Sequence, residues 1–187
     1  MITMPGEQRN APRTRREVLA AAARALIEQG PNVSLDAVAK EAGVSKGGLL
    51  HHFRSKQALI VGLIEEWFDH YDATVESLLE PEDTPGRWTR AHIRATFVPD
   101  DLWSHPSVVT ALLGVPELQQ RLDVAATRWR QQTDSDGLHP QRADLISRAL
   151  DGVTLADLLW RGQETAEERE HTRDLLLKLT EQAGPLV

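Results

Sequence analysis

The chain has 187 residues, a formal net charge of −7, 41% hydrophobic residues and 26% charged residues. This composition is that of a globular protein with a packed core, and the length suits a small domain joined to a larger one. Cysteine is absent, which excludes disulfides, thiolate metal sites and cysteine nucleophiles. No apolar run reaches the roughly 18 residues of a membrane span and no secretory signal is present, so we expect a cytoplasmic protein without a membrane partner.

The charge is divided unevenly along the chain. Residues 1–56 hold nine Lys and Arg against five Asp and Glu, a formal charge of +4, whereas residues 57–187 hold 12 against 23, a charge of −11. Binding to a polyanion depends on the potential of the contacting face and not on the total charge. The asymmetry favours a nucleic-acid-binding N-terminal part, although chance also produces such distributions.

Apolar residues recur at helical spacing along the chain, and no segment alternates as a strand does. Hydroxyl residues precede several of these runs as N-caps, and segments with Gly or Pro separate them. The predicted helices cover about residues 12–29, 35–42, 46–52, 56–79, 87–97, 107–114, 117–132, 141–161 and 166–182. The sequence predicts an all-α protein with an N-terminal arm and three-helix domain, residues 1–56 (the reader), and a C-terminal helical bundle, residues 57–187 (the body).

The segment that carries the function is Ser34–Leu59, with the sequence SLDAVAKEAGVSKGGLLHHFRSKQAL. It predicts a helix, a tight turn at Gly43 and a second short helix, the pattern of a helix-turn-helix whose second helix enters the major groove. Lys46 at the start of that second helix can reach base edges. Gly47 and Gly48 each cost about 1 kcal/mol relative to alanine in a helix, which is tolerable where the backbone must approach DNA closely.

Two further residues of this segment are suited to bind DNA phosphates. Lys56 combines a cation with the free N–H groups at the start of the fourth helix, which form an anion site. Ser34 can contribute its hydroxyl and neighbouring amides in the same way at the start of the second helix.

The segment resembles the DNA-binding region of the tetracycline-repressor (TetR) family in Ser34, Val38-Ala39, Ala42-Gly43-Val44-Ser45, Gly47, His52-Phe53, Ser55-Lys56 and Leu59. The resemblance in motif covers residues 13 to about 62. Leu50 departs from it, because the family usually has a phosphate-binding Tyr there, and either neighbouring histidine is placed to take over that contact. The DNA-binding residues expected from the motif are Ser34, Ser45, Lys46, Gly47, Gly48, Leu50, His51, His52 and Lys56.

The resemblance also implies how such a protein works. It implies a homodimer formed by the last two helices, with each reader on one half of a palindromic operator in double-stranded DNA. A small-molecule effector in the body would move the fourth helix and change the spacing of the readers, which makes the protein a transcriptional regulator, most simply a repressor. The residues expected at the dimer interface are Leu150, Val153, Trp160, Leu175 and Leu179.

All five tryptophans lie in the body, which favours an aromatic-lined effector cavity there. The expected effector-binding residues are Trp67, Trp88, His92, Phe97, Trp103 and Trp129. The alternative is that each of these side chains only fills the core. The identity of the effector and of the operator does not follow from the sequence.

Two other classes of protein are weaker interpretations. A helical module that binds protein through the helix-turn-helix does not explain the basic reader or its exposed glycines. A helical enzyme that used His92, His105 and the loop acids would need a nucleophile and a base at a recognisable spacing, and the sequence offers no such pair. The adjacent His51 and His52 point about 100° apart on a helix and cannot easily share a metal ion, so no metal and no cofactor are expected.

Overall fold

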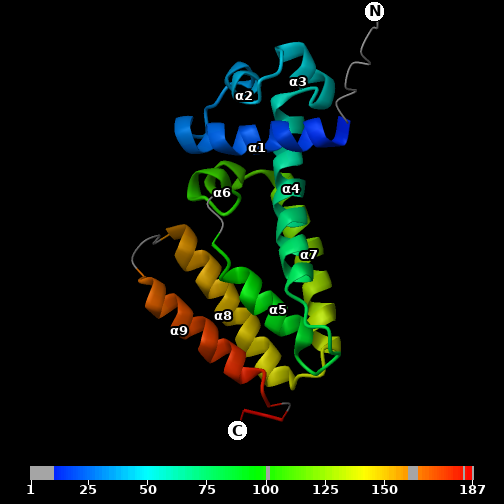
Figure 1. Cartoon of the computed structure of the whole chain (residues 1–187), viewed down its shortest axis with the longest axis vertical. Coiled ribbons are helices and arrows are strands. Elements are labelled where there is room, and N and C mark those ends of the chain that lie inside the picture. The colour runs from blue at the N-terminus through cyan, green and yellow to red at the C-terminus, as the bar shows by residue number, and fades with distance from the viewer. Residues whose placement is uncertain (1–10, 100–101, 160–163, 183, 187) are drawn as a thin grey trace, which may run out of the picture.

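The computed structural model describes residues 11–99, 102–159, 164–182 and 184–186. Within these ranges the chain forms nine α-helices and no strand, which confirms the all-α fold class (Figure 1). None of the described helices is long and apolar enough to cross a membrane. The helices are α1 (Ala11–Gln29), α2 (Leu35–Glu41), α3 (Lys46–His52), α4 (Lys56–Ser77), α5 (Arg87–Thr96), α6 (Pro106–Leu112), α7 (Pro116–Ser135), α8 (Pro140–Leu159) and α9 (Ala166–Leu179).

The reader occupies one end of the molecule, where α1 lies crosswise and α2 and α3 lie on its outer side (Figure 1). The predicted caps start both short helices. The Ser34 hydroxyl accepts a hydrogen bond from the Ala37 amide over 3.1 Å, and the Ser45 hydroxyl accepts one from the Gly48 amide over 3.0 Å. Gly43 between them has φ +64, a left-handed conformation that favours glycine and turns the chain from α2 into α3.

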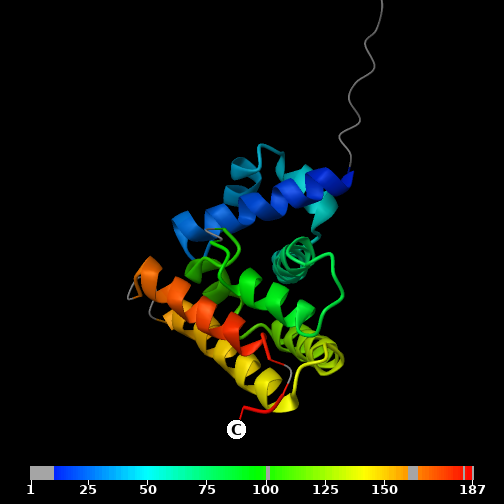
Figure 2. The same ribbon diagram turned by 60° about the horizontal axis from the view of Figure 1, so that its bottom comes forward.

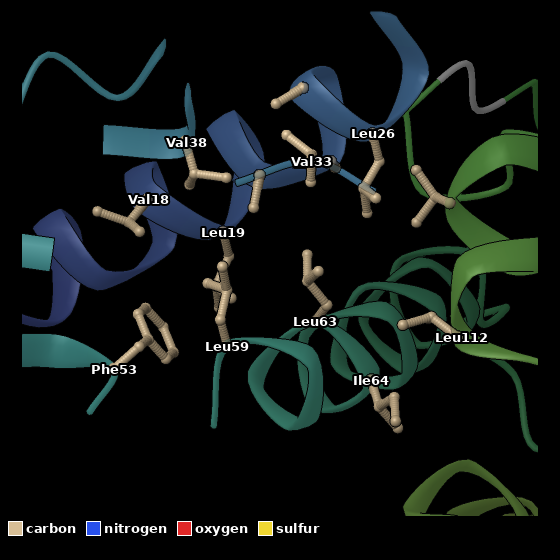
Figure 3. Packing of buried hydrophobic residues seen from close by; sticks show 14 of the residues in the cluster. Val18, Leu19, Leu26, Val33, Val38, Phe53, Leu59, Leu63, Ile64 and Leu112 are labelled. Carbon is tan, nitrogen blue, oxygen red and sulfur yellow. The ribbon is translucent and has the colours of Figure 1, made fainter. Parts of the chain in front are cut away.

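The long helix α4 joins the reader to the body (Figure 1). Its first turns carry Leu59 and Leu63, which are buried in one cluster with Leu19 of α1 and Phe53, the residue that follows α3 (Figure 3). Gly62 makes this approach possible, because a Cβ atom there would lie 2.6 Å from the Phe53 ring. The boundary of residues 56 and 57 therefore falls inside a shared core, and a division of the chain at that point stays a prediction.

The short helix α6 gives the reader a second contact with the body. It packs against α1, and its Leu112 is fully buried in the same cluster as Leu26 of α1 (Figure 3). Val108 of α6 is fully buried in that cluster as well. The reader is thus supported both by the continuous α4 and by α6.

In the body, α5 lies between α4 on one side and α8 and α9 on the other, and α7 packs beside α4 (Figure 2). The first turn of α5 has no cap of its own, because Gly86 precedes it. The Asp136 carboxylate, which follows α7, instead accepts hydrogen bonds from the Trp88 and Thr89 amides over 2.9 and 2.8 Å. This contact holds the start of α5 against the end of α7.

Candidate nucleic-acid interface and effector site

Helix α3 presents its first residues to solvent and its middle to the core. Lys46 and Gly47 are exposed and Gly48 is half-buried, whereas Leu49 is completely buried. After Leu49 the helix turns back toward solvent, so that Leu50 is half-buried and His51 is exposed. The helix is therefore anchored from within while the end that the sequence predicts to face DNA stays open.

The charged side chain of α3 is held by an acid from the neighbouring helix. The Lys46 ammonium lies 3.0 Å from a carboxylate oxygen of Asp36 in the first turn of α2. Both side chains are mostly exposed, 57% for Lys46 and 67% for Asp36. The pair therefore sits on the surface of the reader rather than in its core.

Lys56 lies at the start of α4, is exposed, and has its ammonium 3.5 Å from the Pro31 carbonyl oxygen. Several other cations of the reader are paired with carboxylates: Arg13 with Glu17, Arg16 with Glu66, and Arg24 with Glu41. Among the described residues, three exposed reader cations have no carboxylate partner, namely Lys40, Arg54 and Lys56. Lys40 and Arg54 are absent from the predicted set; they are exposed like the paired arginines and differ from them in having no carboxylate partner among the described residues.

A cluster of aromatic rings lies in the body where α4, α5 and α7 meet. The His92 ring stacks on Trp88 with centroids 4.9 Å apart and lies 5.3 Å from the Trp129 ring. Tyr71 of α4 lies beside the His92 and Trp129 rings, and its ring centroid is 5.5 Å from each of theirs. These four residues, Tyr71, Trp88, His92 and Trp129, are called the aromatic cluster below.

The Tyr71 hydroxyl connects His92 of the aromatic cluster to Thr96 on the same helix α5. The Tyr71 hydroxyl lies 3.0 Å from the Thr96 hydroxyl and 3.3 Å from Nδ1 of His92. Burial lowers the pKa of His92 to about 4, against which the nearby Asp72 carboxylate acts weakly. Burial likewise raises the pKa of Tyr71 to about 12, opposed by its hydrogen bond to Thr96. At neutral pH the cluster is therefore an uncharged aromatic group with a hydroxyl and an imidazole at its centre.

The structure brings together only part of the predicted effector set. Trp88, His92 and Trp129 meet, whereas Trp103 is buried in the core with α6, its ring 6.3 Å from that of His70. Phe97 packs on the other side of α5 in the cluster of Ile93, Leu138, Ile146, Leu150 and Leu176, with the Arg169 guanidinium over its ring. Trp67 is half-buried and its ring lies 5.2 Å from that of Phe68, which in turn lies 6.3 Å from the Trp129 ring.

Tyr71 is the residue of this group that the sequence prediction missed. It lies four residues after Trp67 on the same row of α4, and this spacing could have marked it. A separate cavity of about 30 Å³ lies between α1, α4 and α6, lined by Leu26, Leu63, Leu112 and Lys56 among others. It is much smaller than an apolar cavity of roughly 150 Å³ that binds benzene, so we do not propose it as the effector site.

The predicted dimer residues fall into two groups. Leu175 is exposed and Val153 is half-buried, so both can contribute to a surface of α8 and α9. Leu150 is buried in the core of the chain itself, and Leu179 packs against that core, so they support the helix pair from within. Trp160 lies outside the described residues. Three exposed leucines of α8 that the prediction omitted extend the apolar surface: Leu145, Leu155 and Leu159.

A helix-turn-helix whose second helix begins at the surface, carried on a helical body, is the arrangement found in DNA-binding proteins. A family model described as bacterial regulatory proteins of the tetR family matches residues 18–63, and one described as the tetracyclin repressor-like C-terminal domain matches residues 86–181. The chain belongs to the TetR family of transcriptional regulators. It is therefore a DNA-binding regulator with a C-terminal ligand-binding domain and not an enzyme.

Solved structures have the same fold. A transcriptional regulator from Rhodococcus sp. Rha1 superimposes with a TM-score of 0.72 at 23% identity, covering 92% of this chain and 98% of its own. A TetR-family member from Streptomyces coelicolor A3 gives 0.65 at 22% identity, covering 90% and 99%. The multidrug binding protein EbrR, solved in complex with imidazole, gives 0.62 at 21% identity over the whole of both chains. No curated protein matches the sequence significantly.

Proposed function

We propose that the chain is a homodimeric cytoplasmic repressor that binds a palindromic operator with two copies of α3 and leaves it when a small molecule binds in the body. The observation that carries the proposal is the open start of α3, where Lys46 and Gly47 are exposed on the outer side of the reader while Leu49 anchors the helix. A fold requirement alone does not explain two glycines and a lysine at that place.

The roles within the reader differ. Lys46 contacts base edges, and Gly47 and Gly48 allow the backbone to approach the duplex. Lys56 contacts a phosphate together with the amides that begin α4, and Lys40 and Arg54 add further phosphate contacts as cations without a carboxylate partner among the described residues. The smaller contacts of Ser34, Ser45, Leu50, His51 and His52 fix the position of the two helices on the backbone.

The DNA-binding roles are tested with a gel shift on the duplex just upstream of the chain's own gene, compared with a random duplex at several salt concentrations. Lys56→Ala should weaken binding to both duplexes and make the slope of log K against log salt shallower by about 0.9, the share of one phosphate contact. Lys46→Ala should mainly reduce the preference for the specific duplex. The assigned roles would be contradicted if the two variants lost the same amount of general affinity and the same amount of preference for the specific duplex.

The effector site is proposed at the aromatic cluster. Its rings offer stacking surfaces, and Tyr71 and His92 offer uncharged polar atoms at the centre, a combination suited to a flat aromatic or amphipathic molecule. EbrR, which has this fold, was solved with ethidium and with imidazole. Binding there would act on α4 through Tyr71 and would be passed from α4 to the reader.

Ethidium serves as a probe of this site in the absence of DNA, with quenching of tryptophan fluorescence as the readout. Trp88→Phe should weaken ethidium binding because it removes the ring that stacks on His92. Trp103→Phe is the matched control, since that ring lies outside the aromatic cluster. If the two variants bound ethidium with equal affinity, the aromatic cluster would not be the effector site.

A further inference from the structure

Lys46 is the only Lys or Arg of α3, and an acid of another helix holds it. The sequence of α3 is KGGLLHH, and the Lys46 ammonium lies 3.0 Å from Asp36 in the first turn of α2. Lys46 is also the first residue of its helix, where the positive end of the helix dipole disfavours a cation. Asp36 compensates for this unfavourable position, and its own place at the start of α2 favours a carboxylate.

The ion pair contributes little to the stability of the fold. Pairs between solvent-exposed side chains are screened by water and salt and stabilise proteins only slightly, and these two side chains are 57% and 67% exposed. The other ion pairs within the reader join Arg13 to Glu17 along α1 and Arg24 to Glu41. The pair of Asp36 and Lys46 differs from them because Lys46 belongs to α3, the helix that enters the major groove in the proposed function.

The chemistry of the pair restricts what Lys46 can contact. A phosphate that approached the ammonium would meet the Asp36 carboxylate a few ångströms away and be repelled. A base edge in the major groove presents both kinds of partner: guanine offers the O6 and N7 acceptors and cytosine offers the N4 amino donor. The paired side chains, one donor and one acceptor, match a G·C base pair and do not match a phosphate.

We propose that Asp36 is a specificity-determining residue, which acts with Lys46 as one unit that reads the major-groove edge of a G·C base pair in each half of the operator. The Lys46 ammonium donates to guanine and the Asp36 carboxylate accepts from the cytosine amino group. This inference rests on the proposed function, in which α3 enters the major groove. Without Asp36, Lys46 is free to bind phosphates and loses its preference for bases.

The test is selection from a randomised duplex library by the full-length protein. The wild type should enrich duplexes with a G·C pair at one position of each half-site, and Asp36→Asn should lose the preference at that position. Binding of Asp36→Asn to a random duplex should become several-fold tighter, with a salt slope steeper by about 0.9, because the released Lys46 gains a phosphate contact. Asp36→Glu, which keeps the carboxylate, should retain the selected base pair.

Two controls separate the pair from a general change of charge. Glu28→Gln removes the same charge from α1, at an exposed acid with no ion pair among the described residues, and it should leave the selected base pair and the salt slope unchanged. In a Lys46→Ala background, Asp36→Asn should no longer steepen the slope. The inference is overturned if the wild type selects a sequence that Asp36→Asn selects equally, or if Glu28→Gln has the same effect. Failure of the wild type to select any sequence would overturn the proposed function as well.

Discussion

At the scale of single residues, the buried His92 makes the stability of the protein depend on pH. Its pKa is lowered from 6.5 to about 4 by burial against Trp88, Trp129 and Tyr71. As pH falls below 6.5, the unfolded chain binds a proton at this residue and the folded protein does not. The free energy of unfolding should therefore be at its full value above about pH 6.5 and decrease between pH 6.5 and 4, by about 3 kcal/mol at most.

Urea unfolding at a series of pH values measures this effect. His92→Gln should remove the part of the pH dependence that falls between pH 6.5 and 4, while His171→Gln, at an exposed histidine of α9, should keep that part. A His92→Gln curve parallel to that of the wild type over this interval would show that the imidazole is accessible to protons in the folded state.

The sequence predicted individual residues well where the cause is local. Ser34, Ser45 and Ser55 cap the helices that follow them because a cap depends only on neighbouring residues. The aromatic cluster depends instead on the rotation of α4, α5 and α7 about their axes. That rotation is set by tertiary packing, so the sequence could not separate Trp103 and Phe97 from Trp88 and Trp129.

At the scale of the helices, the glycines of α3 should cost stability and provide function. A Cβ atom at Gly47 would meet only the Ser45 hydroxyl at 3.9 Å, so alanine fits there without strain. Gly47→Ala should therefore increase the free energy of unfolding by up to about 1 kcal/mol, the difference in helix propensity. Its affinity for the operator should fall because the methyl group keeps the backbone from the duplex. Unfolding and gel-shift measurements on one preparation test both parts, and a variant that binds DNA as well as the wild type would contradict the role of close approach.

A second helical glycine should give the opposite result. Gly62 lets α4 pass the Phe53 ring, and a Cβ atom there would lie 2.6 Å from Cε1 of that ring. Because Phe53 is buried, Gly62→Ala should destabilise the protein by about 1–3 kcal/mol despite the better helix propensity of alanine. Gly47→Ala is its control in the same urea titration, and stabilisation by both substitutions would mean that α4 and Phe53 separate easily.

The existence and order of the helices followed from apolar spacing and helix-ending residues. The role of α6 did not, because a seven-residue helix gives little periodic signal and its contact with α1 joins segments far apart in the sequence. The same limit applies to the first turns of α4. Leu59 and Leu63 appear in the sequence as the start of the body, yet they pack in the core of the reader.

At the scale of the whole molecule, the exposed apolar face of α8 and α9 should form the dimer. These helices lie side by side (Figure 1, Figure 2) and carry exposed Leu145, Leu155, Leu159 and Leu175. Leu155→Glu places a charge on a side chain that is 52% exposed in the single chain, and should produce a monomer at micromolar concentration by light scattering. Val124→Glu changes an apolar side chain of α7 that is 62% exposed and should remain dimeric. An interface on α8 and α9 would be contradicted if Leu155→Glu and Val124→Glu both stayed dimeric, or if the wild type were a monomer.

The sequence indicates α8 and α9 as the dimer helices, which stays a prediction, but it does not indicate which of their residues lie on the surface. Both faces of α8 carry leucines, and apolar spacing does not tell which face a partner covers and which face packs on α5. In the structure Leu150 faces α5 and the core, while Leu155 and Leu159 are left exposed.

Hydroxyl-radical footprinting of the operator tests most directly the claim that two readers bind one duplex. The wild type should protect two half-sites related by a dyad, with centres separated by one helical turn of about 10 base pairs or a multiple of it. Lys46→Ala and the monomeric Leu155→Glu should each lose this paired protection at the same protein concentration. A single protected site, or uniform protection without a dyad, would contradict the account.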